Sequence, residues 1–134
     1  MNEYEEMRKE IDIYLMKRYK YRQSLVYLTP DNIVATRRNS RIDLYLRIRK
    51  VESLFPSDCL IIARISFQKE RIGHGSHFVR FLTKIALKYG FKYIGIESTN
   101  EKSASFAKKL GFQPINGSNY AVSVESLIDY FSMF

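Results

Sequence analysis

The stretch LIIARISFQKERIGHGSHFVRFLTKIALKYG, residues 60–90, decides the fold of this chain. Its first part, 60–67, is rich in β-branched residues and predicts a buried strand. Its last part carries apolar residues at helical spacing, which predicts a helix from Ser76 that ends at Gly90. A glycine turn between a strand and a helix leaves backbone N–H groups unpaired at the positive end of the helix dipole, and such an arrangement binds phosphate. We therefore expect the pyrophosphate of a ligand at Arg71-Ile72-Gly73-His74-Gly75-Ser76.

Patterns on both sides of this stretch predict further helices and strands. Helices are expected at 3–19, 100–110 and 125–134, and strands at 24–28, 33–38, 42–49, 91–98, 112–115 and 120–124. This order predicts an α+β (mixed α/β) fold with helices packed on a sheet, in a single domain over residues 1–134. The strand–helix–strand unit at 60–98 predicts a parallel crossover, and ligands of such units bind beyond the carboxyl ends of the strands.

Composition narrows the class of protein. No apolar run approaches the ~20 residues that span a bilayer, and the acidic start lacks the apolar segment of a signal peptide. The only cysteine, Cys59, excludes an internal disulfide, and no residues have the spacing of metal ligands, so we expect no metal. We expect a cytoplasmic protein that does not associate with a membrane.

Positive charge is concentrated in residues 17–50. This region holds ten basic and two acidic side chains, a surplus that equals the net charge of +8 of the whole chain. Such a region favours an anionic partner, for example RNA or an acidic protein, and a solvated basic surface is the plain alternative.

Two motifs carry a resemblance to a known family. The first is Glu70-Arg71-Ile72-Gly73-His74-Gly75, followed by Ser76, which is similar to the pyrophosphate loop Gln/Arg-x-x-Gly-x-Gly/Ala of the GCN5-related N-acetyltransferases (GNAT superfamily). The second resembles the motif Asn-x-x-Ala-x-x-Leu-Tyr-x-Lys-x-Gly-Phe of the same family, through Asn100, Ser103, Phe106, Ala107, Lys109, Gly111 and Phe112. The resemblance covers roughly half of the chain, with both motifs in the family's order.

The resemblance implies a GNAT-like fold: a central, mostly antiparallel and splayed sheet flanked by helices, with the family's first strand missing. It implies acetyl-CoA as cosubstrate. The residues expected to bind it are the backbone of Ala63, Arg64 and Ile65 along the pantetheine arm, the loop residues Arg71, Ile72, Gly73, His74, Gly75 and Ser76, and Asn100 and Lys109. Asn100 is equally suited to cap a helix, and Lys109 to end one.

Departures from the family pattern concern the chemistry. Glu70 replaces the usual Gln or Arg, and Ala107 stands where many GNAT enzymes have the Tyr that protonates the leaving thiolate. For the base we select Glu97, with Ser98 beside it, because it lies at the end of a strand that faces the expected cleft; pairing with a local Arg is its structural alternative. Tyr27 and Tyr45 are candidates to line the acceptor site.

The leading function is therefore transfer of an acetyl or other acyl group from CoA to an amine of an unidentified acceptor. One alternative is a non-catalytic GNAT-fold module that binds nucleic acid or an acidic protein through 17–50. Another is an acyltransferase supplied by acyl carrier protein. The sequence leaves a homodimer open.

Overall fold

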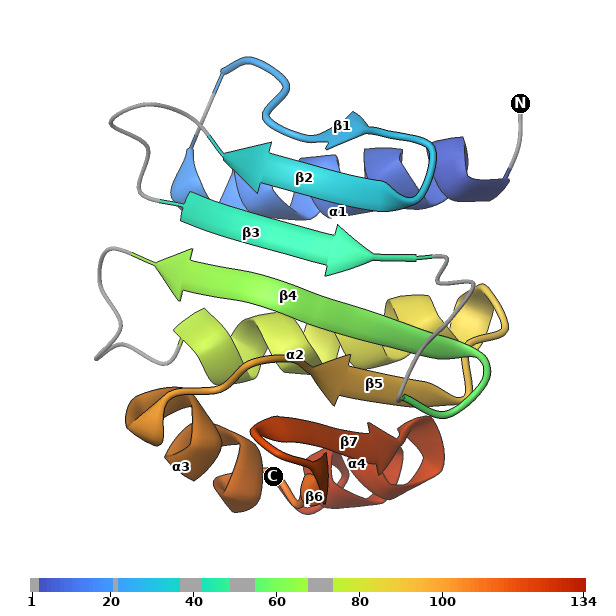
Figure 1. The fold of residues 1–134 in the computed structure, drawn as a ribbon. Coiled ribbons are helices and arrows are strands. Elements are labelled where there is room, and N and C mark those ends of the chain that lie inside the picture. Colours follow the sequence, from blue (N-terminus) through green and yellow to red (C-terminus); the bar gives the residue numbers. More distant parts are fainter. Residues whose placement is uncertain (1–2, 21, 37–41, 49–54, 68–73) are drawn as a thin grey trace.

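Seven strands pair into one sheet in the computed structural model, which describes residues 3–20, 22–36, 42–48, 55–67 and 74–134. The strands lie in the order β1-β2-β3-β4-β5-β7-β6 (Figure 1), and of the six neighbouring pairs only β4–β5 is parallel. In chain order the elements are α1 (Glu3–Tyr19), β1 (Tyr27–Leu28), β2 (Asn32–Thr36), β3 (Ile42–Arg47), β4 (Cys59–Phe67), α2 (His74–Lys88), β5 (Tyr93–Ile96), α3 (Glu101–Lys109), β6 (Gln113–Asn116), β7 (Asn119–Ser123) and α4 (Val124–Phe131).

The expected α+β fold with a mostly antiparallel sheet is confirmed. The largest differences from the expected bounds are at β1 and β5, which are shorter than the sequence predicts. β1 forms only at the end of the expected 24–28, and β5 ends at Ile96 because Ser98 adopts a left-handed backbone conformation that a strand cannot continue. The described chain begins with α1, and the last two residues of the expected strand at 33–38 lie outside the described residues.

The helices bury one face of the sheet. α1 contributes Met7, Ile11 and Leu15, which are spaced by four residues and are wholly shielded from solvent. α2 packs Phe78 and Leu82 into the same core, and both helices lie behind the sheet in Figure 1. We call the opposite side of the sheet the open face.

Both edges of the sheet are short or irregular. At the β1 edge, the Asp12 carboxylate of α1 accepts hydrogen bonds from the backbone N–H groups of Leu25 (2.8 Å) and Val26 (3.2 Å) and from the Ser24 hydroxyl (2.5 Å). At the β6 edge, the pairing with β7 is irregular next to Pro114, which has no N–H group to donate.

Phe55 covers part of the open face. It is buried with Ile61 and Ala121 in a small cluster that is separate from the main core. Its ring lies directly over Gly95 of β5: a Cβ added at Gly95 would be 2.5 Å from Phe55 Cε1 and 3.1 Å from Cys59 Sγ. The close packing therefore requires a glycine at position 95, and burial raises the pKa of the neighbouring, partly buried Cys59 thiol to about 12.

We expect Gly95→Ala to lower the free energy of unfolding by about 1–3 kcal/mol, because a methyl group must displace the Phe55 ring. Urea unfolding followed by circular dichroism measures this difference. In a Phe55→Ala background the ring is gone, so the same Gly95→Ala change should cost much less. Equal costs in both backgrounds would show that Phe55 is not the obstacle.

Candidate functional site

The carboxyl ends of β4 and β5 diverge. Their pairing ends with Ile62↔Ile96, after which the Glu97 N–H donates to the Ile62 carbonyl at 3.0 Å. β4 continues to Phe67 in register with β3 alone. In the described part of the chain, β4 therefore has an open edge towards β5 beyond Ile62.

The three β4 residues expected to line the pantetheine arm, Ala63, Arg64 and Ile65, lie on this open edge. The register with β3 passes from Tyr45↔Arg64 directly to Leu46↔Ile62, so Ala63 is the extra residue of a bulge. A bulge bends its strand and changes the direction of nearby backbone groups, which is a common device next to active sites.

β5 is turned away from β4 at its end. Ser98 has a φ of +52°, and its N–H donates to the side-chain Oδ1 of Asn119 on β7 at 2.8 Å. The next residue, Thr99, donates both its N–H (2.9 Å) and its hydroxyl (2.7 Å) to the Ser118 carbonyl. The chain after β5 is thus bonded to the β6–β7 turn.

The expected phosphate-binding turn is described only in part. Arg71, Ile72 and Gly73, together with Glu70, lie outside the described residues. α2 begins at His74, two residues earlier than predicted, so that Gly75 and Ser76 lie in its first turn, which contains no acidic residue. These first-turn N–H groups and the diverging strands belong to the same end of the sheet (Figure 1).

Gly75 also has a packing role that the sequence did not predict. A Cβ on Gly75 would be 3.2 Å from the Phe106 ring, so the absence of a side chain lets α3 approach the start of α2.

Asn100 serves as the N-cap of α3. Its Oδ1 accepts from the Ser103 N–H at 2.9 Å, and the Ser103 hydroxyl accepts from the Asn100 N–H at 2.9 Å, which forms a capping box. Lys109 is exposed in the last turn of the same helix, where a cation is favourable. Asn100 thus caps α3 and Lys109 lies at its end, as the structural alternatives predict for both residues, and cofactor binding by them stays a prediction.

We expect Asn100→Ala to lower the free energy of unfolding by about 1 kcal/mol through loss of the cap. Asn100→Asp is the matched control because its carboxylate accepts the same hydrogen bond. If Asn100 also contacts an anionic cofactor, Asn100→Asp will keep the stability and still weaken ligand binding. An unchanged melting temperature in Asn100→Ala would contradict the capping role.

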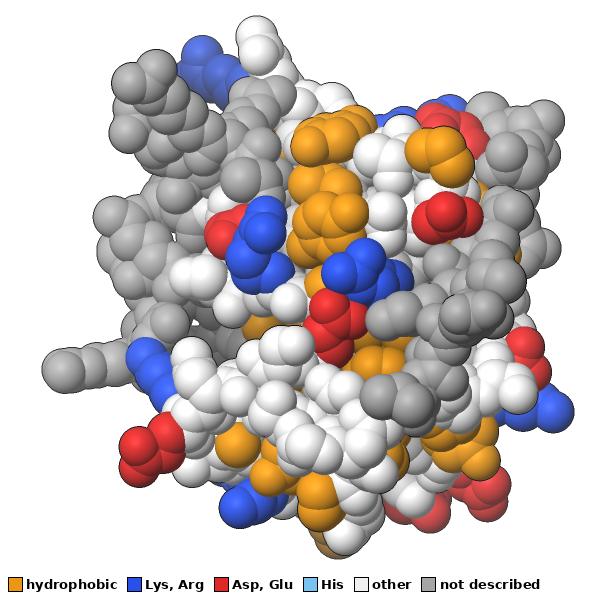
Figure 2. Space-filling model, viewed as in Figure 1, with side chains coloured by type: hydrophobic (Ala, Val, Ile, Leu, Met, Phe, Trp, Pro, Cys, Tyr) orange, Lys and Arg blue, Asp and Glu red, His pale blue; other side chains and the backbone are white. Residues whose placement is uncertain are grey.

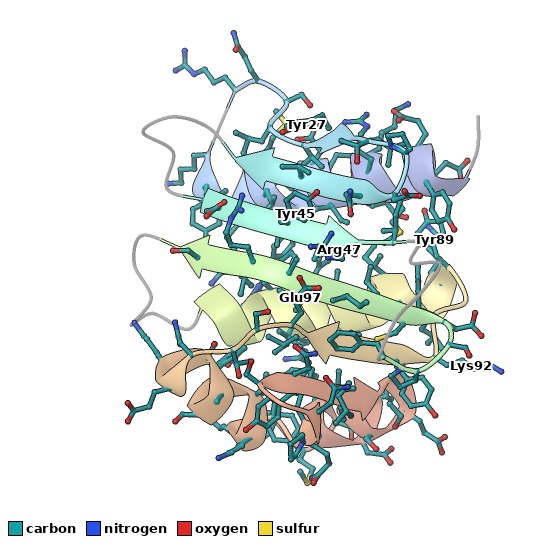
Figure 3. The ribbon with its side chains drawn as sticks, in the orientation of Figure 1. Tyr27, Tyr45, Arg47, Tyr89, Lys92 and Glu97 are labelled. Atoms are coloured by element: carbon teal, nitrogen blue, oxygen red, sulfur yellow. The ribbon has the colours of Figure 1, made fainter. Side chains whose placement is uncertain are left out.

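Glu97, the selected base, is paired with an arginine two strands away. Both of its carboxylate oxygens accept from Arg47 of β3, at 2.9 Å from Nε and 3.0 Å from Nη2. The pair spans β4 on the open face (Figure 3), and its hydrogen bonds are the largest cause of the raised pKa of Arg47.

Aromatic and basic side chains continue this pair across the open face. The Arg47 and Arg64 guanidinium carbons lie 5.3 and 5.6 Å from the centre of the Tyr45 ring. Arg64 is paired in turn with Asp43, with Nε–O distances of 2.7 and 2.8 Å. Tyr27, 51% exposed, extends the row to the edge of the sheet (Figure 3), and Figure 2 shows basic side chains beside a stripe of apolar and aromatic ones on this face.

Ala107 is wholly buried in α3, so its methyl group fills core space and donates no proton.

His77 is exposed on the first turn of α2, and its Nδ1 lies 2.5 Å from the Tyr14 hydroxyl oxygen. Burial and the nearby cations Arg18, Arg80 and Lys84 lower the pKa of His77.

Within the described residues, no group of three or more potential ligands could hold a metal ion, and none of the helices has the length and apolarity needed to cross a membrane.

For Glu97 the structural alternative, pairing with an arginine, is realised, but the partner is the distant Arg47 and not a local residue. Sequence reasoning also missed the Asn119 side chain that accepts from the Ser98 N–H. In each case the two residues come from different parts of the sheet. Their polar character is visible in the sequence, whereas their proximity depends on the order of strands in the sheet.

Comparison with known proteins places the fold. No protein-family model matches the sequence, and no curated protein matches it. Among solved structures, a point variant of the AtaT toxin bound to the C-terminus of the antitoxin AtaR and to acetyl-CoA is 19% identical, with a TM-score of 0.52 over 75% of this chain and 71% of that chain. The KacTA–DNA complex contains a chain that is 16% identical, with a TM-score of 0.53 over 94% of this chain and 86% of that one.

A third structure gives the fold its name. A protein from Desulfovibrio desulfuricans, described as an acetyltransferase of the GNAT family, is 12% identical, with a TM-score of 0.50 over 69% of this chain and 67% of that chain. At these identities the likeness is one of fold. The chain has the fold of the GCN5-related N-acetyltransferases, as the two sequence motifs predict.

Proposed function

We propose that this chain is a GNAT enzyme that transfers an acetyl group from acetyl-CoA to an amine. The observation that carries the proposal is the open edge of β4 beyond Ile62, next to the start of α2. A thioester arm needs backbone hydrogen-bonding groups that no neighbouring strand occupies, and a pyrophosphate needs a helix N-terminus close by. The solved structure of the AtaT variant with acetyl-CoA supports the choice of cosubstrate.

In this proposal the backbone of Ala63, Arg64 and Ile65 binds the pantetheine arm and orients the thioester carbonyl. The N–H groups of residues 71–76 bind the pyrophosphate, where Gly73 and Gly75 let the backbone approach the anion. Asn100 and Lys109 lie at the two ends of α3, and contacts from them to the cofactor remain part of the proposal.

The chemistry is attack of the acceptor nitrogen on the thioester carbonyl. The C–N bond forms, the C–S bond breaks, and the amine proton passes to Glu97 or to a water bound to it. Arg47 keeps the carboxylate oriented towards the open face, and Ser98 lies beside it. Because Ala107 has no proton to give, the departing thiolate takes a proton from water.

We expect the purified protein to bind acetyl-CoA in isothermal titration calorimetry. Gly73→Glu should weaken binding by roughly a hundredfold or more, because a carboxylate would face the pyrophosphate. Ser57→Glu is the control. It adds the same charge in the exposed turn before β4, at the end of this strand that is far from the expected pyrophosphate site, and should leave acetyl-CoA affinity unchanged. Glu97→Gln should retain acetyl-CoA affinity and slow acetyl transfer by about 10²–10⁴-fold.

Absence of binding at millimolar acetyl-CoA would overturn the proposal. Mass spectrometry of the native protein gives an independent check, since a bound CoA or acyl-CoA would be detected directly.

We propose in addition that an anionic macromolecule binds the basic region 17–50 together with α2. The positive charges of Arg18 in this region and of Arg80 and Lys84 in α2 all lower the pKa of His77. Cations from two helices therefore lie close to the same side chain. α2 itself has no acidic residue. Of the region's ten basic residues, Lys17, Arg18, Lys20, Arg22 and Arg47 are described, and Arg37, Arg38, Arg41, Arg49 and Lys50 lie outside the described residues.

RNA is the partner we favour over an acidic protein, because cations at positions i and i+4 of a helix lie about 6 Å apart and can follow successive phosphates. Fluorescence anisotropy with a labelled single-stranded RNA should show an affinity that falls steeply between about 50 and 200 mM salt. Arg80→Glu/Lys84→Glu should weaken binding about tenfold or more, whereas Lys108→Glu on α3 should not. Equal losses in both variants would contradict a defined surface. A cytoplasmic location, a single domain and a homodimer stay predictions.

A further inference from the structure

The end of β5 is held in an unfavourable backbone conformation. Ser98 has a φ of +52°, and a left-handed conformation is costly for a residue with a side chain other than Asn or Asp. Such conformations persist when surrounding contacts impose them, and they cluster at functional sites. Glu97, directly before Ser98, makes the last hydrogen bond between β5 and β4.

The imposing contact comes from Asn119 on β7. Its Oδ1 accepts from the Ser98 N–H at 2.8 Å, and its Nδ2 donates to Asn116 Oδ1 at 2.7 Å. The second bond fixes the amide of Asn119 so that its oxygen faces Ser98. The β6–β7 turn adds the two bonds from Thr99 to the Ser118 carbonyl, so the chain is bonded to the hairpin at Ser98 and Thr99, directly after the last bond from Glu97 to β4.

The register of β4 and β5 shows where the chain would lie if Ser98 were extended. An extended Ser98 would continue β5 along β4, which extends five residues beyond its last β5 partner, Ile62. Such an extension would occupy the backbone of Ala63, Arg64 and Ile65. The open edge of β4 therefore depends on what directs Ser98 away from it.

We infer that Asn119 is a positioning residue that keeps the cofactor-binding edge of β4 open by holding Ser98 in its left-handed conformation. The inference rests on the proposed function for the ligand, because acetyl-CoA is what the open edge would bind. Asn119 itself need not touch the cofactor. The β6–β7 hairpin then determines whether this binding edge is accessible.

The test combines removal of the hydrogen bond with relief of the strain. Asn119→Ala should weaken acetyl-CoA binding about tenfold in calorimetry, because Ser98 loses the contact that offsets its left-handed conformation. Ser98→Gly added to Asn119→Ala should restore most of the affinity, since glycine adopts positive φ without a Cβ penalty. Asn32→Ala, at the far side of the sheet, is the matched control and should leave the affinity unchanged.

Hydrogen–deuterium exchange gives a second measurement that needs no ligand. In Asn119→Ala, the backbone of 63–65 should become more protected as β5 extends along it, and Ser98→Gly should return the exchange to that of the wild type. Unchanged exchange and affinity in Asn119→Ala would overturn the inference, as would a loss of affinity that Ser98→Gly does not restore. If no variant binds acetyl-CoA but the exchange follows this pattern, the proposed function fails and the control of the β4 edge by Asn119 stands.

Discussion

The unequal pairing of β4 is the constraint on which the rest of the structure depends. Along one side β4 is in register with β3 from Ile61 to Phe67, and along the other it pairs with β5 only from Cys59 to Ile62. A sheet that continued on both sides would leave no backbone group free for a ligand. Because one neighbour stops early, a central strand of the sheet has hydrogen-bonding groups available to another molecule. The bulge at Ala63 and the turn at Ser98 are both placed where this difference begins.

Most of the fold could be predicted because its signals are local. Alternation along 42–48 and the four-residue spacing of Met7, Ile11 and Leu15 each belong to one element, and each gave that element within two residues of its bounds. Sequence reasoning was less successful where one element is shaped by another. β1 is short because an α1 side chain binds the backbone before it, and β5 is short because a β7 side chain binds the backbone after it.

The same distinction separates the parts of the candidate site. Two glycine-containing motifs were sufficient to predict the kind of fold, since their spacing reflects one turn and one helix. Pairing of Glu97 with an arginine was an alternative from the sequence, but the identity of that arginine was not predictable, because Arg47 is fifty positions earlier in the chain and two strands away. The open face thus carries charges arranged in pairs, Arg47 with Glu97 and Arg64 with Asp43. A charged substrate that binds there replaces existing ion pairs with new ones. The net gain in affinity is therefore small, and the charge pattern contributes mainly to selectivity.

The two edges of the sheet bear on the behaviour of the protein in solution. An unpaired edge strand is a template on which another chain can add, and long flat edges promote aggregation. Here one edge is two residues long and is preceded by a segment whose N–H groups are already bonded to Asp12; the other contains Pro114 and an irregular register. Within the described ranges, neither edge offers a regular ladder to a second copy. Self-association of this chain, if it occurs, is therefore expected to use side-chain surfaces, and the sheet is protected from growing into a fibril at its ends.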